Sequence, residues 1–318
     1  MMRKTPRRTS TSDGTTSTRT PSIRRTMPSV LSDMCPTSLR LDEHDYAVCN
    51  CPTQSGEAQI GFGTRLRCTM LPMKIMAIDG SPHGASGNTS LLLERFVSGA
   101  LEAGAEVERV PVHSLRIEPC CSRMVCWYRT PGVCIHRDDV SDIMPRLAEA
   151  DVWVLSTPVH VGGMTESMVR FMERTVVLLS PMYEIHEGRT RHVASPYGGH
   201  KTVALISTCG YYEESAFESL VSQARDVTRS HHRRFAGALL RPHGLALKYM
   251  QANGVDVRDV LEAAHKAGVE LVTSGTFGDD TLRAVSRPLL SREDFVAMMN
   301  SAFERRMGCR PGYTPGCA

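Results

Sequence analysis

From residue 73 onward, short runs of apolar residues alternate with longer amphipathic stretches. Short apolar runs that end in turn-forming residues are typical of buried strands, and apolar residues spaced three and four positions apart are typical of helices with one buried face. The pattern predicts five strands, at residues 74–79, 106–113, 152–158, 202–208 and 235–241. It predicts six helices, at about residues 88–104, 139–150, 164–178, 213–230, 256–274 and 291–307.

This alternation of strands and helices predicts an α/β fold. Strand–helix–strand crossovers give a parallel sheet that is covered on both faces, and five such strands fit a flavodoxin-like doubly wound sheet. Ligands bind such sheets at the carboxyl ends of the strands. We therefore expect the site in the loops 80–88, 158–163 and 208–212. Pro145 falls within a predicted helix, so we expect a kink there or a late start.

Residues 1–72 lack this pattern. Residues 1–30 are rich in Ser, Thr, Arg and Pro and hold too few apolar residues to form a core face. We expect a disordered extension over residues 1–72, one domain over 73–308 and a tail over 309–318. The extension has the composition of a transit peptide. We favour the alternative that translation really begins at Met73 and that the assigned start lies too far upstream.

Charge is distributed unevenly along the chain of 318 residues. Residues 1–72 hold 10 Lys and Arg against 6 Asp and Glu, and the remainder holds 27 against 28. A domain without a basic surplus gives no reason to expect a nucleic-acid partner. The sequence has no apolar run long enough to cross a bilayer and no signal-peptide core, so we expect no membrane partner and a cytoplasmic location.

The stretch "GSPHGASGNTS", residues 80–90, lies between the first predicted strand and the first predicted helix. A helix N-terminus has free N–H groups and the positive end of the helix dipole, so it favours an anion. Glycines let the backbone approach closely, and the hydroxyl side chains add donors. The composition indicates a phosphate held without a basic residue. The Lys of a phosphate-loop ATPase motif and the spacing of the dinucleotide fingerprint are both missing. An ordinary capped loop is the alternative.

Three stretches, "GSPHGASGNTS", "DVWVLSTPVHVGGM" and "VRFMERT", together resemble the NADPH-dependent FMN reductase-like flavoproteins. The cysteine stretch "PCCSRMVCWYRTPGVC" resembles the iron–sulfur flavoprotein branch of that superfamily. The four motifs occur in the family's order and at similar spacings between residues 73 and 308. The resemblance implies a flavodoxin-like fold that binds FMN.

In this family the Ser-Pro…Gly-Asn-Thr loop holds the FMN phosphate, and the Thr-Pro-Val loop runs beside the isoalloxazine ring. The resemblance implies the following FMN-binding residues: Ser81, Pro82, Gly87, Asn88, Thr89, Ser90, Thr157, Pro158, Val159, His160, Gly162, Gly163, Thr208, Cys209 and Gly210. The family has Tyr where this chain has His160, so we expect the imidazole to offer a hydrogen bond in place of ring stacking. A surface loop histidine is the alternative. Tyr211 or Tyr212 is expected to cover the ring or line the acceptor pocket, or to serve as packing.

The family's cluster branch has a Cys-x2-Cys-x2-Cys-x(4–7)-Cys motif after the second strand. This chain has Cys120, Cys126 and Cys134 at three of the positions, but Arg123 at the second. Cys121 is the candidate fourth ligand, although adjacent cysteines on one cluster demand an awkward backbone. An arginine cannot ligate iron, so we favour a loop without a cluster, shaping the flavin pocket with Trp127 as a wall, over an intact iron–sulfur cluster. A zinc site lacks its usual Cys-x-x-Cys pair.

The resemblance implies a function as an FMN-dependent NAD(P)H oxidoreductase of the flavin or quinone reductase type. Hydride arrives from the nicotinamide and leaves as hydride or as single electrons, and no side chain is needed as a catalytic acid or base. The alternative is a non-enzymatic electron carrier of the iron–sulfur flavoprotein type. We expect a homo-oligomer. The apolar residues of the predicted helix 164–178 are expected in the core or at a dimer interface: Met164, Met168, Val169 and Met172.

Overall fold

The computed structural model describes residues 72–193, 195 and 201–307, together with the backbone of four short strands nearer the N-terminus. The chain divides into two units, residues 1–71 and 72–318. The first unit holds a small sheet of order β1-β2-β4-β3 that the sequence pattern does not predict. Its strands are β1 (Arg40–Leu41), β2 (Tyr46–Cys49), β3 (Gly56–Ile60) and β4 (Thr64–Cys68). The rest of the predicted extension and the predicted tail lie outside the described residues.

The second unit is built on a five-stranded parallel sheet of order β11-β10-β7-β5-β6. Its strands are β5 (Lys74–Asp79), β6 (Glu106–Pro111), β7 (Val152–Ser156), β10 (Thr202–Thr208) and β11 (Arg234–Arg241). This order is that of a flavodoxin-like doubly wound sheet, which confirms the predicted fold class. The order reverses between β5 and β7, so a ligand crevice is expected at their carboxyl ends.

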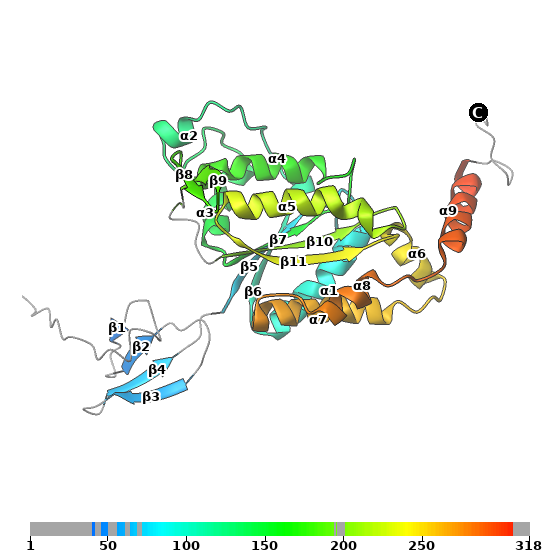
Figure 1. The fold of residues 1–318 in the computed structure, drawn as a ribbon, viewed down its shortest axis with the longest axis horizontal. Coiled ribbons are helices and arrows are strands. Elements are labelled where there is room, and N and C mark those ends of the chain that lie inside the picture. The colour runs from blue at the N-terminus through cyan, green and yellow to red at the C-terminus, as the bar shows by residue number, and fades with distance from the viewer. Residues whose placement is uncertain are drawn as a thin grey trace, which may run out of the picture. The chain divides into compact units, whose positions relative to one another are not determined.

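Helices cover both faces of this sheet (Figure 1). One face carries α3 (Asp139–Glu149), α4 (Glu166–Arg174) and α5 (Glu218–Ser230). The other carries α1 (Asn88–Glu102), α7 (Arg258–Ser274) and α8 (Asp279–Ser286). Three further helices are α2 (Val125–Tyr128), α6 (Leu247–Ala252) and α9 (Arg292–Met307). Figure 1 shows α2 at one end of the sheet and α6 at the other.

The elements that the sequence pattern misses are short or polar. They are α2, α6 and α8, together with a hairpin of β8 (Tyr183–His186) and β9 (Arg189–His192). The predicted late start of the helix around Pro145 is wrong. That helix starts at Asp139 and runs through Pro145, because Asp138 and Ser141 form a capping box that fixes its first turn.

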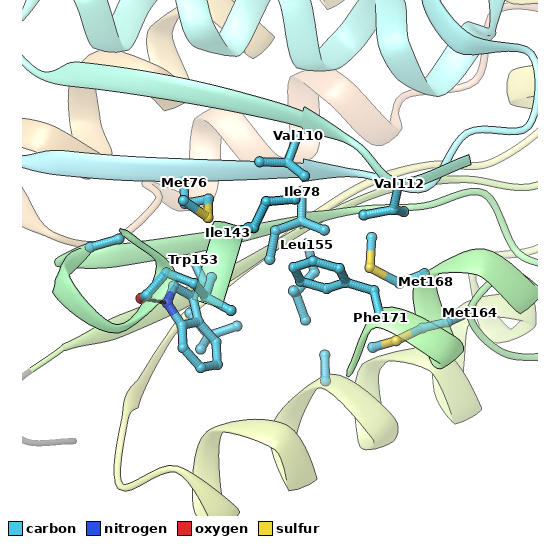
Figure 2. Close-up of a cluster of buried hydrophobic side chains, with 14 of the residues drawn as sticks. Met76, Ile78, Val110, Val112, Ile143, Trp153, Leu155, Met164, Met168 and Phe171 are labelled. Carbon is cyan, nitrogen blue, oxygen red and sulfur yellow. Dashed lines mark hydrogen bonds between the residues drawn. The ribbon is translucent and has the colours of Figure 1, made fainter. Parts of the chain in front are cut away.

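Two apolar clusters form the core, one on each face of the sheet. Figure 2 shows the cluster in which Met76, Ile78 and Leu155 of the strands meet Phe171 of α4. Met164 and Met168 are buried in the same cluster, which confirms their expected place in the core. Alternate residues of each strand face opposite clusters, since successive side chains of a strand point to opposite faces.

In the described part of the chain, no helix has the length and apolar character needed to cross a membrane.

Candidate functional site

The loop after β5 opens directly into α1, whose N-terminus is not capped by a side chain. Gly87 is the N-cap residue in an extended conformation, and the first turn contains no acidic residue. The N–H groups of Asn88, Thr89 and Ser90 belong to the first turn of a helix, where they have no intrahelical acceptor. They carry the positive end of the helix dipole, so this end of α1 can hold an anion.

The buried carboxylate of Asp79 holds this loop in place from below. It accepts hydrogen bonds from the backbone N–H of Ser81 at 3.1 Å and from the Ser90 hydroxyl at 3.0 Å. It also forms an ion pair with Arg109, whose Nη2 lies 2.6 Å from Asp79 Oδ2. The Ser90 hydroxyl is therefore directed into the protein, and Ser90 can offer a ligand its backbone N–H.

Two further side chains of the α1 N-terminus connect the loop to other elements, Thr89 to β10 and Asn88 to the segment around α6. The Thr89 and Thr208 hydroxyls lie 2.6 Å apart and are buried, which joins the loops after β5 and β10. The pair uses one hydroxyl proton for its mutual hydrogen bond and retains the other for a further acceptor. The Asn88 amide donates to the Leu245 carbonyl at 3.2 Å, and its oxygen accepts from the Lys248 N–H at 3.0 Å.

The loop after β7 forms a tight turn at the same edge of the sheet. His160 and Gly163 exchange backbone hydrogen bonds at 3.0 and 2.9 Å, and Val161 and Gly162 between them have φ of +50° and +78°. Positive φ costs a glycine little, but it strains a β-branched residue. Val161 is also fully exposed. The loop is tied to the next one, since the Val159 N–H donates to the Thr208 carbonyl at 2.9 Å.

The two candidate tyrosines of the loop after β10 lie in different environments. Tyr212 is stacked on His243 with ring centroids 5.0 Å apart, and its hydroxyl donates to the Leu290 carbonyl at 3.0 Å. Tyr212 therefore serves as packing. Tyr211 is 69% exposed, so it is the tyrosine that a ligand at this edge can meet. A side chain at Gly210 would contact no described atom within 4 Å, which leaves open space above this loop.

His243 and Arg241 complete this edge, and the sequence analysis missed both. His243 accepts hydrogen bonds at Nε2 from the Leu289 N–H at 3.2 Å and from Arg241. Burial, together with the Arg241 charge, lowers the pKa of His243 to about 4, so the imidazole is neutral at neutral pH. Burial also raises the pKa of the Cys209 thiol. The sequence signal was the "RPHG" turn at the end of the fifth strand, where a buried Arg and His follow an apolar run.

The predicted cysteine ligands gather around one cavity, which we call the cysteine pocket. Cys120, Cys121, Cys126 and Cys134 all line it. Ser122 and Met124 have φ of +51° and +54°, so the chain turns sharply twice between Cys121 and Cys126. Burial raises the pKa of the Cys126 thiol, and the three other cysteines raise it further, which keeps Cys126 protonated.

A buried ion pair supports the cysteine pocket. Arg174 forms a two-pronged contact with Asp138, with an Nη1–Oδ2 distance of 2.5 Å, and also donates to the Glu118 carbonyl at 2.8 Å. Burial favours the protonated carboxyl, but the Arg174 hydrogen bond and the Glu118 N–H outweigh it, so the pKa of Asp138 is lowered. In the described part of the chain, Arg174 Nε and His136 Nε2 are buried without a hydrogen-bond partner.

The cysteine pocket lies apart from the three strand-end loops described above. Its lining residues Arg174 and Val176 stand at the end of α4, and Trp127 donates to the Val176 carbonyl at 3.0 Å. The loop after β7 leads into the start of α4, and a helix of nine residues is about 13 Å long. Among the described residues Trp127 contacts Val176 and His192. Within this chain Trp127 thus lies at the end of α4 that is far from the loop after β7, and its expected place at the flavin pocket stays a prediction.

The residues of the cysteine pocket, as placed, do not fit an iron–sulfur cluster. The donor types are right, since thiols and an imidazole line the cavity. The cavity holds only about 20 Å³, little more than the ~10–15 Å³ that one water needs. Among the described residues, no three His, Cys, Asp or Glu side chains are close enough to hold a metal ion. Arg123 also lines the cavity and supplies no ligand to iron.

The sequence model of one protein family, described as NADPH-dependent FMN reductase, matches residues 73–236, just over half of the chain. The chain belongs to this family. The match begins one residue before β5 and ends within β11, so it covers four strands, the start of the fifth, and the loops after β5, β7 and β10. His243, Lys248 and the helices after them lie outside the matched residues.

Curated relatives of the chain come from archaea. An iron–sulfur flavoprotein of Methanocaldococcus jannaschii is 33% identical over 32% of this chain and 52% of its own length. An iron–sulfur flavoprotein of Archaeoglobus fulgidus is 32% identical over 32% of this chain and 45% of its own length. The match thus spans about half the length of these relatives. A solved FMN-dependent NADH-azoreductase from Bacillus anthracis is 13% identical, with a TM-score of 0.45 over 63% of this chain and 98% of that chain.

Proposed function

We propose that the protein binds FMN at the carboxyl edge of the five-stranded sheet and acts as an NAD(P)H-dependent oxidoreductase. The observation that carries this proposal is the uncapped N-terminus of α1 at the point where the strand order reverses, in a chain of the FMN reductase family. When bound, FMN would accept hydride from a nicotinamide and pass reducing equivalents to an acceptor. The chain's own residues bind and orient the cofactor.

The FMN phosphate would lie against the first turn of α1. The backbone N–H groups of Asn88, Thr89 and Ser90 would donate to it, and the spare proton of the Thr89–Thr208 pair would add a hydroxyl donor. Gly87 gives the loop room, because a Cβ there would collide with the Ser81 hydroxyl. The hydroxyl and amide side chains of the loop would not all donate to the phosphate, since the Asn88 and Ser90 side chains form hydrogen bonds within the protein.

The ring of FMN would lie between the loops after β7 and β10. Thr157 is fixed there by a hydrogen bond from the Thr165 N–H to its hydroxyl at 3.1 Å, and Val159 is fixed by its bond to the Thr208 carbonyl. Gly162, Gly163 and Gly210 would let the ring approach the backbone. Tyr211 and His160 are exposed and would face the electron donor or acceptor. This side of the ring would stay accessible, so that donor and acceptor could bind in turn.

Purified protein would test this proposal directly. We expect a yellow protein whose bound flavin is released on denaturation and identified as FMN, and whose absorption bleaches when NADH or NADPH is added without oxygen. Comparing bleaching rates with the two nicotinamides would identify the donor. A colourless protein that binds no added FMN would contradict the proposal.

A second candidate function is electron transfer between protein partners without a nicotinamide, as an iron–sulfur flavoprotein. The observation in its favour is the convergence of four cysteines on one cavity, in a chain whose curated relatives carry that name. FMN that stays oxidised with both nicotinamides, but is reduced by a chemical reductant, would favour this candidate.

A further inference from the structure

Lys248 on α6 reaches back to the loop that precedes α1. Its ammonium donates to the Ser86 carbonyl at 2.7 Å and lies 3.4 Å from the Ala85 carbonyl. Its backbone N–H donates to the Asn88 side chain at 3.0 Å. Lys248 is thus held to this loop at both its backbone and its ammonium, although the two segments are 160 residues apart in the sequence.

The charge of Lys248 is not balanced by a carboxylate in the described part of the chain. Its ammonium contacts carbonyl oxygens, which are neutral acceptors, and two contacts leave one of its three protons unused. Arg109, the other strong cation close to this end of β5, is already paired with Asp79 at 2.6 Å. The loop itself, residues 80–90, contains no Lys or Arg. Lys248 therefore brings to this loop an ammonium that no carboxylate of the described residues pairs with.

We infer that Lys248 is a ligand of the FMN phosphate and makes the site select FMN over riboflavin, which lacks the phosphate. The inference rests on the proposed function. A phosphate carries a charge of about −1.5 to −2 at neutral pH, and helix N–H groups supply only partial positive charge. An ammonium at the same place forms a charge-assisted hydrogen bond, which is about twice as strong as a neutral one.

This role would belong to a segment outside the part of the chain that matches the family. The match ends at residue 236, whereas Lys248 follows β11 on α6. Asn88 holds α6 in position through the Leu245 carbonyl and the Lys248 N–H. Asn88 at the start of α1 would thus act on the phosphate indirectly. It binds α6, and α6 carries the Lys248 ammonium to the phosphate.

Flavin affinities of matched variants would test the inference. Lys248→Gln keeps a hydrogen-bond donor and removes the charge, Lys248→Arg keeps the charge, and Lys266→Gln removes an exposed lysine of α7 as a control. Dissociation constants for FMN and for riboflavin would be measured by quenching of flavin fluorescence at low and at high salt. Thermal unfolding without flavin would show that each variant is folded.

We expect Lys248→Gln to weaken FMN binding about 10-fold or more and to change riboflavin binding less than about 2-fold. Lys248→Arg and Lys266→Gln should retain the preference for FMN, and added salt should weaken FMN binding more in the parent than in Lys248→Gln. Equal loss of both flavins in Lys248→Gln would show a purely structural role and overturn the inference. Unchanged FMN affinity would also overturn it while leaving the proposed function intact. A parent that binds neither flavin would overturn the proposed function itself.

Discussion

The carboxyl edge of the sheet and the cysteine pocket both contain polar residues that the sequence marks as candidate ligands, but the chain treats them differently. At the edge, the hydroxyls of Thr89, Thr208 and Ser90 are buried and bonded to partners from other elements. In the pocket, the thiols are partly or fully exposed and come from one stretch of chain. Positions fixed by distant elements form a preorganised binding site, whereas a local cluster on a loop can change shape.

The two regions also differ in what lies beneath them. The loops of the edge are joined by hydrogen bonds from strand to strand, through Gly80 to Ser156 and Val159 to Thr208. The cysteine pocket depends on one ion pair, Arg174 with Asp138, whose side chains are 1% and 0% exposed. Substitutions in the two regions should therefore have separable effects. Those at the carboxyl edge should change flavin binding, and those in the ion pair next to the cysteine pocket should change the stability of the fold.

The largest expected effect is on the ion pair below the cysteine pocket. Replacing Asp138 with Ala should lower the free energy of unfolding by about 3–5 kcal/mol, because it leaves the Arg174 charge buried without a partner. Urea unfolding followed by circular dichroism would measure the loss. Asp226→Ala, in the exposed pair with Arg229, is the matched control and should change stability by less than about 1 kcal/mol. A similar small loss in Asp138→Ala would show that water reaches the Arg174 charge.

The next effect is a loss of folding stability at acid pH. One buried histidine near the cysteine pocket and one at the carboxyl edge contribute to it. Burial lowers the pKa of His231, which contacts Thr175 beside the pocket, to about 4, and burial with the Arg241 charge does the same for His243 at the edge. Both are neutral in the folded protein and protonated below about pH 6.5 when unfolded. The unfolded chain therefore binds more protons between pH 6.5 and 4, and stability falls as the pH falls through this window.

Each of these histidines should cost about 2 kcal/mol between pH 7 and pH 5. Unfolding measured at several pH values should show a shallower slope in His231→Gln and in His243→Gln. Only His243→Gln should also weaken FMN binding, because His243 supports Tyr212 and the loop after β10. His186→Gln, which alters an exposed histidine, serves as the control. Slopes equal to that of the parent in both variants would contradict the prediction.

A smaller effect is expected from the Asn88 side chain, which connects the edge to α6. Asn88→Ala should weaken FMN binding about 10-fold by releasing Leu245 and Lys248, and should lower thermal stability only slightly. Flavin titration and thermal unfolding would measure the two quantities separately. Asn253→Ala, which removes an amide from the far end of α6, should bind FMN like the parent. A loss of stability without a loss of affinity would assign Asn88 a purely structural role.

The smallest effect is expected from the cysteines. Anaerobically purified protein should show a plain flavin spectrum without acid-labile sulfide. Ala substitutions at Cys120, Cys121, Cys126 and Cys134 should then change stability by about 1 kcal/mol or less and leave FMN bound, since the side chains are small and partly exposed. Iron and sulfide assays would decide the point. Stoichiometric iron and sulfide, lost in each variant, would show that the loop opens to hold a cluster.

The sheet was predictable because its strands carry strong local signals. The strands 74–79 and 202–208 have the predicted bounds, since each is a continuous apolar run ended by turn-forming or hydroxyl residues. The β8–β9 hairpin escaped prediction because its residues are mostly polar and exposed. Helix α6 escaped because it has only six residues and forms through contacts with the distant residue Asn88.

The candidate site was predictable as a set of loops, but not as a set of contacts. Motif and topology predict Asn88 and Thr89 at the carboxyl edge of the sheet, where the structure has them. They do not reveal that the Asn88 amide bonds to α6, or that Tyr212 is taken up by a stack with His243. They also do not reveal that Trp127 bonds to the Val176 carbonyl after α4, since a sequence motif does not say in which direction a loop runs. Contacts between segments far apart in the chain depend on the complete fold.

The hydrogen bonds between Asn88 and α6 also determine when, during synthesis, the site is completed. They join residues 157 and 160 positions apart, so half of the chain must be made after Asn88 before its amide finds these partners. Domains are synthesised from the N-terminus, and contacts between distant residues form late. A nascent chain that ends before residue 245 would present the loop after β5 without α6. The cofactor would therefore be captured firmly only after residues 245–248 have been made and α6 has reached Asn88.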